Sequence, residues 1–381
     1  MPTTNEDFFL NKRDWSLIKD DVLRTYMVPY LTKIQRLSDR GRTPNIMLID
    51  CYAGAGTFDD GSDGSPLIMT KAAERHAPGR YDAFFINCDS NHHTKLQAAL
   101  ATNAALLPDK RWSGRIATRL GKSEDELPEI AEHLGNASVF LYLDPFGLKG
   151  CAFALIRPFL ERSSRYSTEI VMTFNMPGVH RMAARKQVAA GKMTPQITAN
   201  HQILDEVFGG DYWRQYLLDD NEATAEEREW KLIEAYRLHL TTYLRYVQYC
   251  PVRESSEARI KYFIVCASRH IDCLQLMNEA MTKAYFKQMH AQSYKDSLFA
   301  ESDWRADRDI RDLAQTIVAT VGRLPQSPRN TIWQQIVQDH FMRYLASEYK
   351  EAVKTLVKQK VLCFSSQTKK LNDDALLWLA E

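Results

Sequence analysis

The spacing of apolar residues near the start of the chain predicts a long helix. Between residues 8 and 40, apolar side chains recur at steps of three and four, among them Leu17, Val22 and Tyr26. This is the period of one face of an α-helix. The sequence Gly41-Arg42-Thr43-Pro44 ends the pattern, because glycine and proline close helices. We therefore expect a helix over 8–40 that buries one face.

Short apolar runs then alternate with helical stretches. Five runs have the length and content of buried strands, at residues 46–49, 83–88, 115–120, 139–143 and 169–174. Helical patterns separate them, for example from His92 to Leu106 and from Phe153 to Glu161. Such alternation is typical of α/β proteins in which helices cover a parallel sheet. The fold class predicted is a doubly wound, Rossmann-like α/β sheet.

The predicted sheet carries an insertion and ends with a hairpin. Residues 180–245 are mostly helical and polar, as in a cap added to the sheet. Residues 246–249 and 261–267 have the pattern of two late strands, joined by a short linker that contains Pro251. A short linker favours an antiparallel pair. With a helix from Cys273 to about Met289, these segments complete one predicted domain over residues 1–290.

The remaining part of the chain has a different organisation. Residues 291–325 are polar and charged, and we interpret them as a linker. Helical patterns at 331–345 and 348–359 precede two short apolar runs at 361–364 and 375–379. Two helices followed by a hairpin are the layout of a winged helix-turn-helix. A second domain of this type is therefore predicted over residues 326–381.

Composition narrows the class of protein. The chain has 49 Lys and Arg against 48 Asp and Glu, a net charge of +1, so a basic surface over the whole molecule is excluded and any basic patch is local. Its seven cysteines include no C-x-x-C pair, which favours buried thiols in a reducing compartment and no metal site. We find no signal-peptide pattern and no apolar run near the roughly 20 residues of a membrane span. A cytoplasmic protein without a membrane partner is expected.

A glycine-rich segment directly follows the first predicted strand. Its sequence is Asp50-Cys51-Tyr52-Ala53-Gly54-Ala55-Gly56. Two glycines this close allow a tight turn and let a ligand approach the backbone. No Gly-Lys-Ser/Thr follows, so the segment is not a Walker A loop. It resembles motif I of class I methyltransferases, which implies S-adenosylmethionine as cofactor, bound by Asp50, Tyr52, Ala53, Gly54 and Gly56.

Two further residues follow the next strands. Asp89 comes after the second strand and Ser123 after the third. Ligands of doubly wound sheets bind outside the carboxyl ends of the strands. A carboxylate at position 89 suits the two hydroxyls of a ribose, and the less favoured alternative is that it caps the helix that follows. Ser123 is a weaker candidate near the adenine, by analogy with related enzymes.

The fourth strand ends in Asp144-Pro145-Phe146-Gly147. An aspartate leaving a buried strand before a proline presents a polar group on a fixed backbone. The tetrapeptide resembles the D-P-P-Y/F motif of amino methyltransferases, which implies that Asp144 and Pro145 hold an exocyclic amine and that Phe146 lines the base pocket. The aromatic residue stands third here rather than fourth, which puts base stacking in doubt.

These segments together resemble the three-Cys-motif partner protein family, a methyltransferase-like family. The matching stretches are 49–56, 60–67, 143–150 and 173–176, and the resemblance extends over roughly residues 8–290. It implies a partner protein, encoded nearby, that carries the cysteine motif, so the cysteines of this chain need no metal role. Some versions of the family carry a winged-helix tail, which agrees with the pattern after residue 326.

The predicted winged helix is locally basic. Between Arg323 and Lys370 the chain has nine basic and three acidic residues. Local enrichment of this kind is the expected footprint of contact with phosphate, and residues four apart share one face of a helix. The candidate nucleic-acid-binding residues are Lys350, Lys354, Lys358, Lys369 and Lys370. A solvated helix face or a protein-binding winged helix would have the same pattern.

Three functions follow from these features. The first is an S-adenosylmethionine-dependent methyltransferase that acts on nucleic acid, at an amino nitrogen oriented by Asp144. The second is a catalytically inert methyltransferase-like protein that binds DNA through its tail, as a regulator or defence component. The third is a metal-dependent nuclease with Asp50, Asp89 and Asp144 as ligands, for which no Glu-x-Lys nuclease core is visible.

Overall fold

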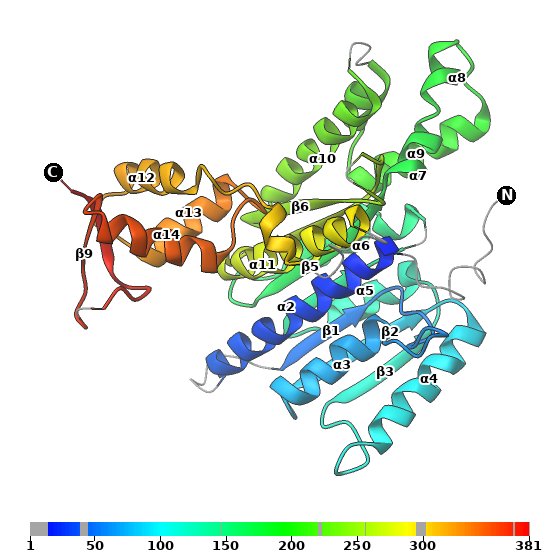
Figure 1. Cartoon of the computed structure of the whole chain (residues 1–381). Coiled ribbons are helices and arrows are strands. Elements are labelled where there is room, and N and C mark those ends of the chain that lie inside the picture. The colour runs from blue at the N-terminus through cyan, green and yellow to red at the C-terminus, as the bar shows by residue number, and fades with distance from the viewer. Residues whose placement is uncertain are drawn as a thin grey trace. The chain divides into compact units, whose positions relative to one another are not determined.

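The computed structural model divides the chain into two compact units, Met1–His270 and Ile271–Glu381 (Figure 1). It describes residues 14–38, 45–145, 147–219, 223–255, 257–294, 302–368 and 370–380. Each unit is considered by itself below. The division falls before the helix that starts at residue 271, whereas the sequence pattern placed the end of the first domain near residue 290.

The first unit is built on a seven-stranded sheet. Its strands are β1 (Ile46–Asp50), β2 (Tyr81–Asn87), β3 (Arg115–Leu120), β4 (Ser138–Leu143), β5 (Thr168–Asn175), β6 (Tyr246–Arg253) and β7 (Ile260–Ser268). Their order is β3-β2-β1-β4-β5-β7-β6. The first five are parallel, and β7 is antiparallel to both neighbours. The predicted doubly wound α/β sheet is confirmed.

The strand order reverses between β1 and β4, which lie side by side at the centre of the sheet. Every residue of both strands is buried. Helices lie on both faces, so central strands of this kind consist almost entirely of apolar residues. A crevice opens at the carboxyl ends of strands where the order of a doubly wound sheet reverses. This rule places the expected ligand site beside Asp50 and the end of β4.

The helices of the sheet follow the predicted alternation. They are α2 (Asp14–Ser38), α3 (Ser65–His76), α4 (Ser90–Ala105), α5 (Ser123–His133), η1 (Lys149–Cys151) and α6 (Phe153–Leu160). In Figure 1, α2, α3 and α4 lie in front of the sheet and α5 lies behind it. The N-terminal helix predicted over 8–40 is present from residue 14 to residue 38, and its other residues lie outside the described part of the chain.

The helical insertion lies between β5 and β6. It contains α7 (Met176–Ala183), α8 (Arg185–Ala189), α9 (Pro195–Phe208), the π-helical turn η2 (Gln215–Asp219) and α10 (Ala225–Thr241). Aromatic packing joins it to the sheet: the rings of Phe174 on β5 and Tyr236 on α10 have centroids 4.8 Å apart. Both rings are fully buried. The insertion therefore belongs to the core of the first unit.

The hairpin that ends the sheet differs from the prediction in one detail. Pro251 was expected in the linker, but it lies inside β6. Strand β6 is at the edge of the sheet and pairs only with β7. A proline without an N–H group is compatible with an edge strand, because its open side needs no ladder hydrogen bond. The linker itself occupies residues 254–259.

The second unit is helical with a small sheet. It consists of α11 (Ile271–Ser293), η3 (Trp304–Asp307), α12 (Leu313–Arg323), β8 (Ser327–Pro328), α13 (Arg329–Asp339), α14 (Ala346–Lys358), β9 (Leu362–Ser365) and β10 (Leu376–Leu379). The three strands form an antiparallel sheet in the order β8-β10-β9. The segment expected as a linker, 291–325, thus contains the end of α11, η3 and α12. No helix in the described part of the chain is long and apolar enough to span a membrane.

Candidate functional site

A cavity opens at the carboxyl ends of β1 and β4 in the first unit. The volume of the cavity is about 190 Å³. Its lining comes from α2, the segment after β1, the start of α3, the ends of β4 and β5, and β7. The lining residues are Lys19, Asp20, Tyr52, Gly54, Ala55, Gly56, Thr57, Phe58, Gly64, Ser65, Pro66, Tyr142, Asp144, Pro145, Thr173, Asn175 and Tyr262.

The glycine loop, residues 50–56, is held between two strands. The Cys51 N–H donates to the carbonyl of Tyr142 on β4 at 3.0 Å, and the Ala53 N–H donates to the carbonyl of Ile86 on β2 at 3.0 Å. Gly56 has φ +83°, and a Cβ there would lie 3.0 Å from the Ala99 Cβ on α4. A side chain at this position is disfavoured by backbone conformation and by space. Gly54 and Gly56 both line the cavity, so its wall at this point is bare backbone.

The polar segment after the loop folds back on itself. Thr57 and Asp63 form an antiparallel bridge, and the Gly64 N–H donates to the Gly56 carbonyl at 2.8 Å. Thr57, Phe58 and Gly64 of this segment line the cavity. A serine before a proline is typical of a helix cap, but the N-cap of α3 is Gly64, and Ser65 is the first residue of the helix. The Ser65 hydroxyl instead donates to Asp50 Oδ2 at 2.6 Å.

Asp50 is a completely buried carboxylate. Its Oδ1 accepts the Tyr52 N–H at 3.0 Å and its Oδ2 accepts the Ser65 hydroxyl. Burial raises its pKa to about 7, against the lowering effect of these two hydrogen bonds, and Asp144 and Asp20 raise it slightly further. Asp50 does not line the cavity itself; Ser65 and Tyr52, which it binds, do. The carboxylate therefore acts on the cavity from one layer behind it.

Tyr52 and Ser123 are brought together at the loop. Ser123 is buried and its hydroxyl donates to the Cys51 carbonyl, so it fixes the loop and does not line the cavity. Tyr52 does line it. A Cβ on Gly150 would lie 1.8 Å from the Tyr52 hydroxyl oxygen. The glycine that ends the stretch 143–150 is thus the residue that leaves room for Tyr52.

Two polar residues at the carboxyl end of β2, Asn87 and Asp89, have different roles. Asp89 is the N-cap of α4: it accepts the His92 N–H at 2.8 Å, which lowers its pKa. Its side chain is 48% exposed and does not line the cavity. Asn87, which sequence reasoning missed, donates from its amide to the carbonyls of Ala53 and Gly54 and accepts the Asp89 N–H at 2.9 Å. One amide thereby fixes both the glycine loop and the start of the helix.

Asp144 faces the cavity from the end of β4. Its Oδ1 accepts the Thr173 hydroxyl at 2.6 Å, and its Oδ2 forms an ion pair with Lys19 Nζ at 2.5 Å. Pro145 lines the cavity beside it. Phe146, the third residue of the predicted catalytic set, lies outside the described residues. The structure therefore brings Asp144 and Pro145 to the same cavity as the glycine loop.

Lys19 is a site residue that no sequence motif predicts. It extends from α2, its side chain is 13% exposed, and its ammonium lies 5.3 Å from the centre of the Tyr262 ring. A lysine in an amphipathic helix has the sequence signature of a solvated position. Lys19 and Asp144 are 125 residues apart in the sequence, and only the packing of α2 on the sheet brings them into contact.

Among the described residues, no group of three His, Cys, Asp or Glu side chains is arranged to hold a metal ion. Asp50, Asp89 and Asp144 were the expected ligands of the nuclease alternative. Their places differ: Asp50 is buried behind Ser65, Asp89 caps α4, and only Asp144 lines the cavity. Nothing in this arrangement supports that alternative.

The candidate nucleic-acid residues lie in the second unit. Lys350, Lys354 and Lys358 are exposed on α14, and Lys370 is exposed after β9. Lys369 lies outside the described residues. Part of the basic character of this segment is structural, because Arg323 pairs with Asp339, Arg329 with Asp373 and Arg343 with Asp312.

Comparisons add little to this geometry. No family profile matches the sequence, and no curated protein matches it. Solved structures with a similar fold include a Clostridium thermocellum protein described as an rRNA methylase (8% identity, TM-score 0.30, 62% of this chain and 94% of that one). A second is the DszA carbon methyltransferase (11% identity, TM-score 0.30, 61% of this chain and 50% of that one). Likenesses this distant bear no argument about activity, which rests on the site itself.

Proposed function

We propose that the chain binds S-adenosylmethionine in the cavity beside the glycine loop and methylates nucleic acid. One observation carries the proposal: the glycine loop at the end of β1 and the Asp144-Pro145 pair at the end of β4 open onto one cavity, at the point where the strand order reverses. This is the position at which doubly wound sheets bind their ligands. The cofactor supplies an electrophilic methyl group on a sulfonium.

The residues present fit such a ligand. The wall at Gly54 and Gly56 has no side chains, and a Cβ at position 56 is disfavoured by its backbone conformation and by its close approach to α4. Two further acidic groups stand at or behind the lining, namely Asp20 and the buried Asp50, as a cation requires. Tyr52, Gly54 and Gly56 would hold the cofactor, and Asp89, which remains half exposed at the start of α4, would take the ribose hydroxyls.

Asp144 would orient the acceptor. Methyl transfer needs little acid–base chemistry and depends chiefly on the position of the nucleophile. The Thr173 hydroxyl and the Lys19 ammonium fix both carboxylate oxygens, and each oxygen keeps a lone pair for an N–H group. A carboxylate held this way would accept a hydrogen bond from an N–H group of the acceptor amine. The lone pair of the amine nitrogen would then point into the cavity.

A second candidate function follows from the same contacts. Because Lys19 and Thr173 already occupy Asp144, an inert protein that binds the cofactor and nucleic acid without methyl transfer is the alternative. The test uses the full chain with S-adenosylmethionine, RNA and DNA, and compares wild type, Asp144→Ala and the exposed loop variant Asp109→Ala. We expect Asp144→Ala to keep calorimetric cofactor binding and to lose about 100-fold or more of the label transfer, with Asp109→Ala unchanged. Binding without any transfer by wild type favours the inert alternative, and no cofactor binding refutes both.

We also propose that the second unit contains a winged helix-turn-helix, in a chain of the three-Cys-motif partner family. The order helix, strand, helix, helix, strand, strand from α12 to β10 supports the winged helix. Its second and third helices pack through stacked rings of Trp333 and Tyr349, 5.0 Å apart. Helix α14 would then be the recognition helix, with Lys350, Lys354 and Lys358 toward phosphate. The partner protein that the family implies is part of this proposal.

A further inference from the structure

One stretch of the first unit, which starts in β5 beside the cavity, has no acidic residues. Between residues 170 and 204 the chain has no Asp or Glu, although it has 48 of them among 381 residues. The same run contains Arg181, Arg185, Lys186 and Lys192. It includes the end of β5, all of α7 and α8 and much of α9. The first unit therefore has a strongly positive segment in a chain whose net charge is nearly zero.

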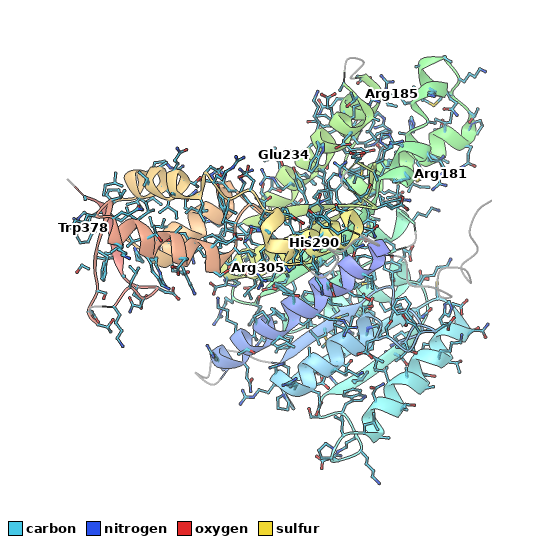
Figure 2. All side chains as sticks on the ribbon, viewed as in Figure 1. Arg181, Arg185, Glu234, His290, Arg305 and Trp378 are labelled. Carbon is cyan, nitrogen blue, oxygen red and sulfur yellow. The ribbon has the colours of Figure 1, made fainter. Side chains whose placement is uncertain are left out.

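This segment begins at the cavity. Asn175 lines the cavity and is also the N-cap of α7, because its Oδ1 accepts the Gly178 N–H at 2.9 Å. A Cβ on Gly178 would lie 3.5 Å from Asn175 Oδ1 and 3.8 Å from the Arg181 guanidinium. Arg181 is thus about one side chain away from the cavity wall. Figure 2 shows Arg181 and Arg185 in this part of the first unit.

The basic side chains are available to a ligand. Arg181, Lys186 and Lys192 are exposed, and in the described part of the chain none of the three pairs with a carboxylate. Surface cations in proteins are usually interspersed with anions. Three cations without a carboxylate partner, in a run that begins at a ligand cavity, therefore indicate a polyanionic partner.

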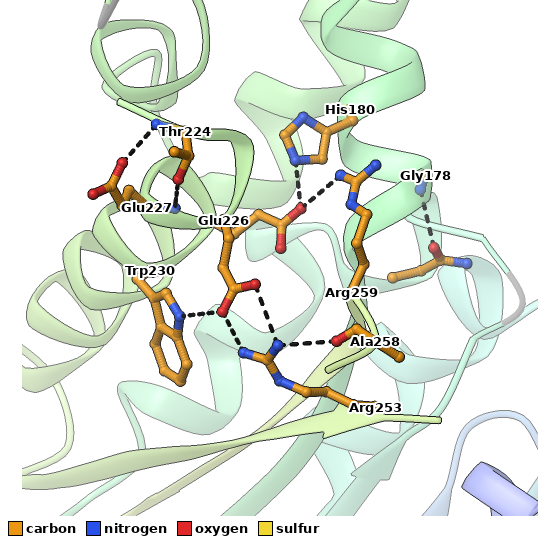
Figure 3. Close-up of polar contacts among 11 residues, drawn as sticks. Gly178, His180, Thr224, Glu226, Glu227, Trp230, Arg253, Ala258 and Arg259 are labelled. Carbon is orange, nitrogen blue, oxygen red and sulfur yellow. Dashed lines mark hydrogen bonds and ion pairs between the residues drawn. The ribbon is translucent and has the colours of Figure 1, made fainter. Parts of the chain in front are cut away.

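The start of the segment is joined to α10 by polar contacts of one buried glutamate (Figure 3). Glu229 on α10 is 1% exposed, and its Oε1 contacts His180 Nε2 of α7 at 2.7 Å and Arg259 Nη2 at 3.2 Å. Arg259, from the turn between β6 and β7, keeps 70% of its side chain exposed. These contacts hold α7 against α10 and place a further cation, Arg259, beside α7.

We propose that α7, α8 and the residues after α8 up to Lys192 form a phosphate-binding surface that receives the nucleic-acid backbone beside the cavity. The inference rests on the proposed function for the identity of the substrate, and it assigns to the first unit a contact that is separate from the lysines of α14. Backbone contacts position a nucleic acid without reading its sequence. A target base would enter the cavity while its flanking phosphates lie along Arg181, Lys186 and Lys192.

The test is binding of the full chain to a short labelled RNA strand and a short labelled DNA duplex, followed by fluorescence anisotropy from about 50 to about 200 mM salt. The variant is Arg181→Ala, Lys186→Ala and Lys192→Ala combined. Its matched control is Arg75→Ala, Lys110→Ala and Arg111→Ala combined, which removes three exposed cations from the opposite edge of the sheet, where β2 and β3 begin. A negatively charged polyglutamate is the third probe, and calorimetric S-adenosylmethionine binding is measured on every protein.

We expect the α7–α8 variant to lose about tenfold or more in affinity for at least one nucleic acid, and the slope of log affinity against log salt to shrink by about 2–3. The control variant keeps the wild-type slope, and both variants keep cofactor affinity. A wild-type slope in the α7–α8 variant overturns the inference. Polyglutamate binding equal to that of nucleic acid also overturns it, in favour of an acidic protein partner. Loss of nucleic-acid affinity in a protein that binds no cofactor would keep this surface and refute the proposed function instead.

Discussion

The buried carboxylate of Asp50 makes the stability of the protein depend on pH in a definite direction. Burial raises its pKa to about 7 in the folded chain, whereas an unfolded aspartate titrates near 3.9. The neutral acid is therefore favoured by folding. Its stabilising contribution is complete below about pH 4 and is lost as the pH rises through about 7. The variant Asp50→Asn has the same shape, keeps an oxygen for the Tyr52 N–H, and does not titrate.

The size of the effect follows from the two pKa values. One pKa unit corresponds to 1.36 kcal/mol. The free energy of unfolding of wild type therefore falls by this amount for each pH unit between the two pKa values. At about pH 5 only the first unit of this interval has been crossed, and at about pH 8 all of it has. The free energy of unfolding of Asp50→Asn, relative to wild type, should therefore rise by about 3 kcal/mol between these two pH values.

Chemical denaturation of both proteins at the two pH values measures this difference directly. Asp109→Asn, at an exposed loop position, is the control and should show no such rise. A difference between Asp50→Asn and wild type that does not change with pH would refute the reasoning, because it would mean that Asp50 titrates alike in both states. A cationic ligand in the cavity favours the ionised form of Asp50. S-adenosylmethionine at about pH 8 should then stabilise wild type more than Asp50→Asn.

Three further predictions concern the site and the tail. Gly150→Ala forces Tyr52 to move, so it should cost about 1–3 kcal/mol of stability in thermal unfolding and weaken cofactor binding; Gly147→Ala, which meets no atom within 4 Å, should do neither. Asn87→Ala removes the donors to the Ala53 and Gly54 carbonyls and should cost about 1–3 kcal/mol, and a cost no larger than that of the exposed Asn91→Ala would contradict the role given to Asn87. Combined Lys350→Ala, Lys354→Ala and Lys358→Ala should lower nucleic-acid affinity and its salt slope without changing cofactor binding, and unchanged affinity would exclude α14 as a recognition helix.

The sequence was sufficient for the sheet because its signals are local. Each central strand is a short apolar run, and the polar residues that matter for position, Asp50 and Asp144, stand directly at strand ends. The two strands pair in the structure. Parallel strands of a doubly wound sheet end at one edge, so their convergence on one cavity needed no further information.

The remaining site residues depend on contacts between distant segments. Lys19 reaches Asp144 across 125 positions, and Ser123 reaches the Cys51 carbonyl across 72. Neither contact has a spacing that a pattern can reveal. Ser65 shows the same limit at short range. Its place before Pro66 is typical of a helix cap, but its hydroxyl donates to the buried Asp50 and the N-cap is Gly64. An isolated carboxylate in the interior is costly, so tertiary packing overrides the local preference.

A crystal structure of the full chain grown with saturating S-adenosylhomocysteine tests the central claim most directly. The account predicts ligand density in the cavity between the glycine loop and Asp144, in contact with the backbone of Gly54 and Gly56 and beside Tyr52. A cavity without the ligand under those conditions, or a ligand bound elsewhere in the chain, would contradict the proposal that this cavity binds the methyltransferase cofactor.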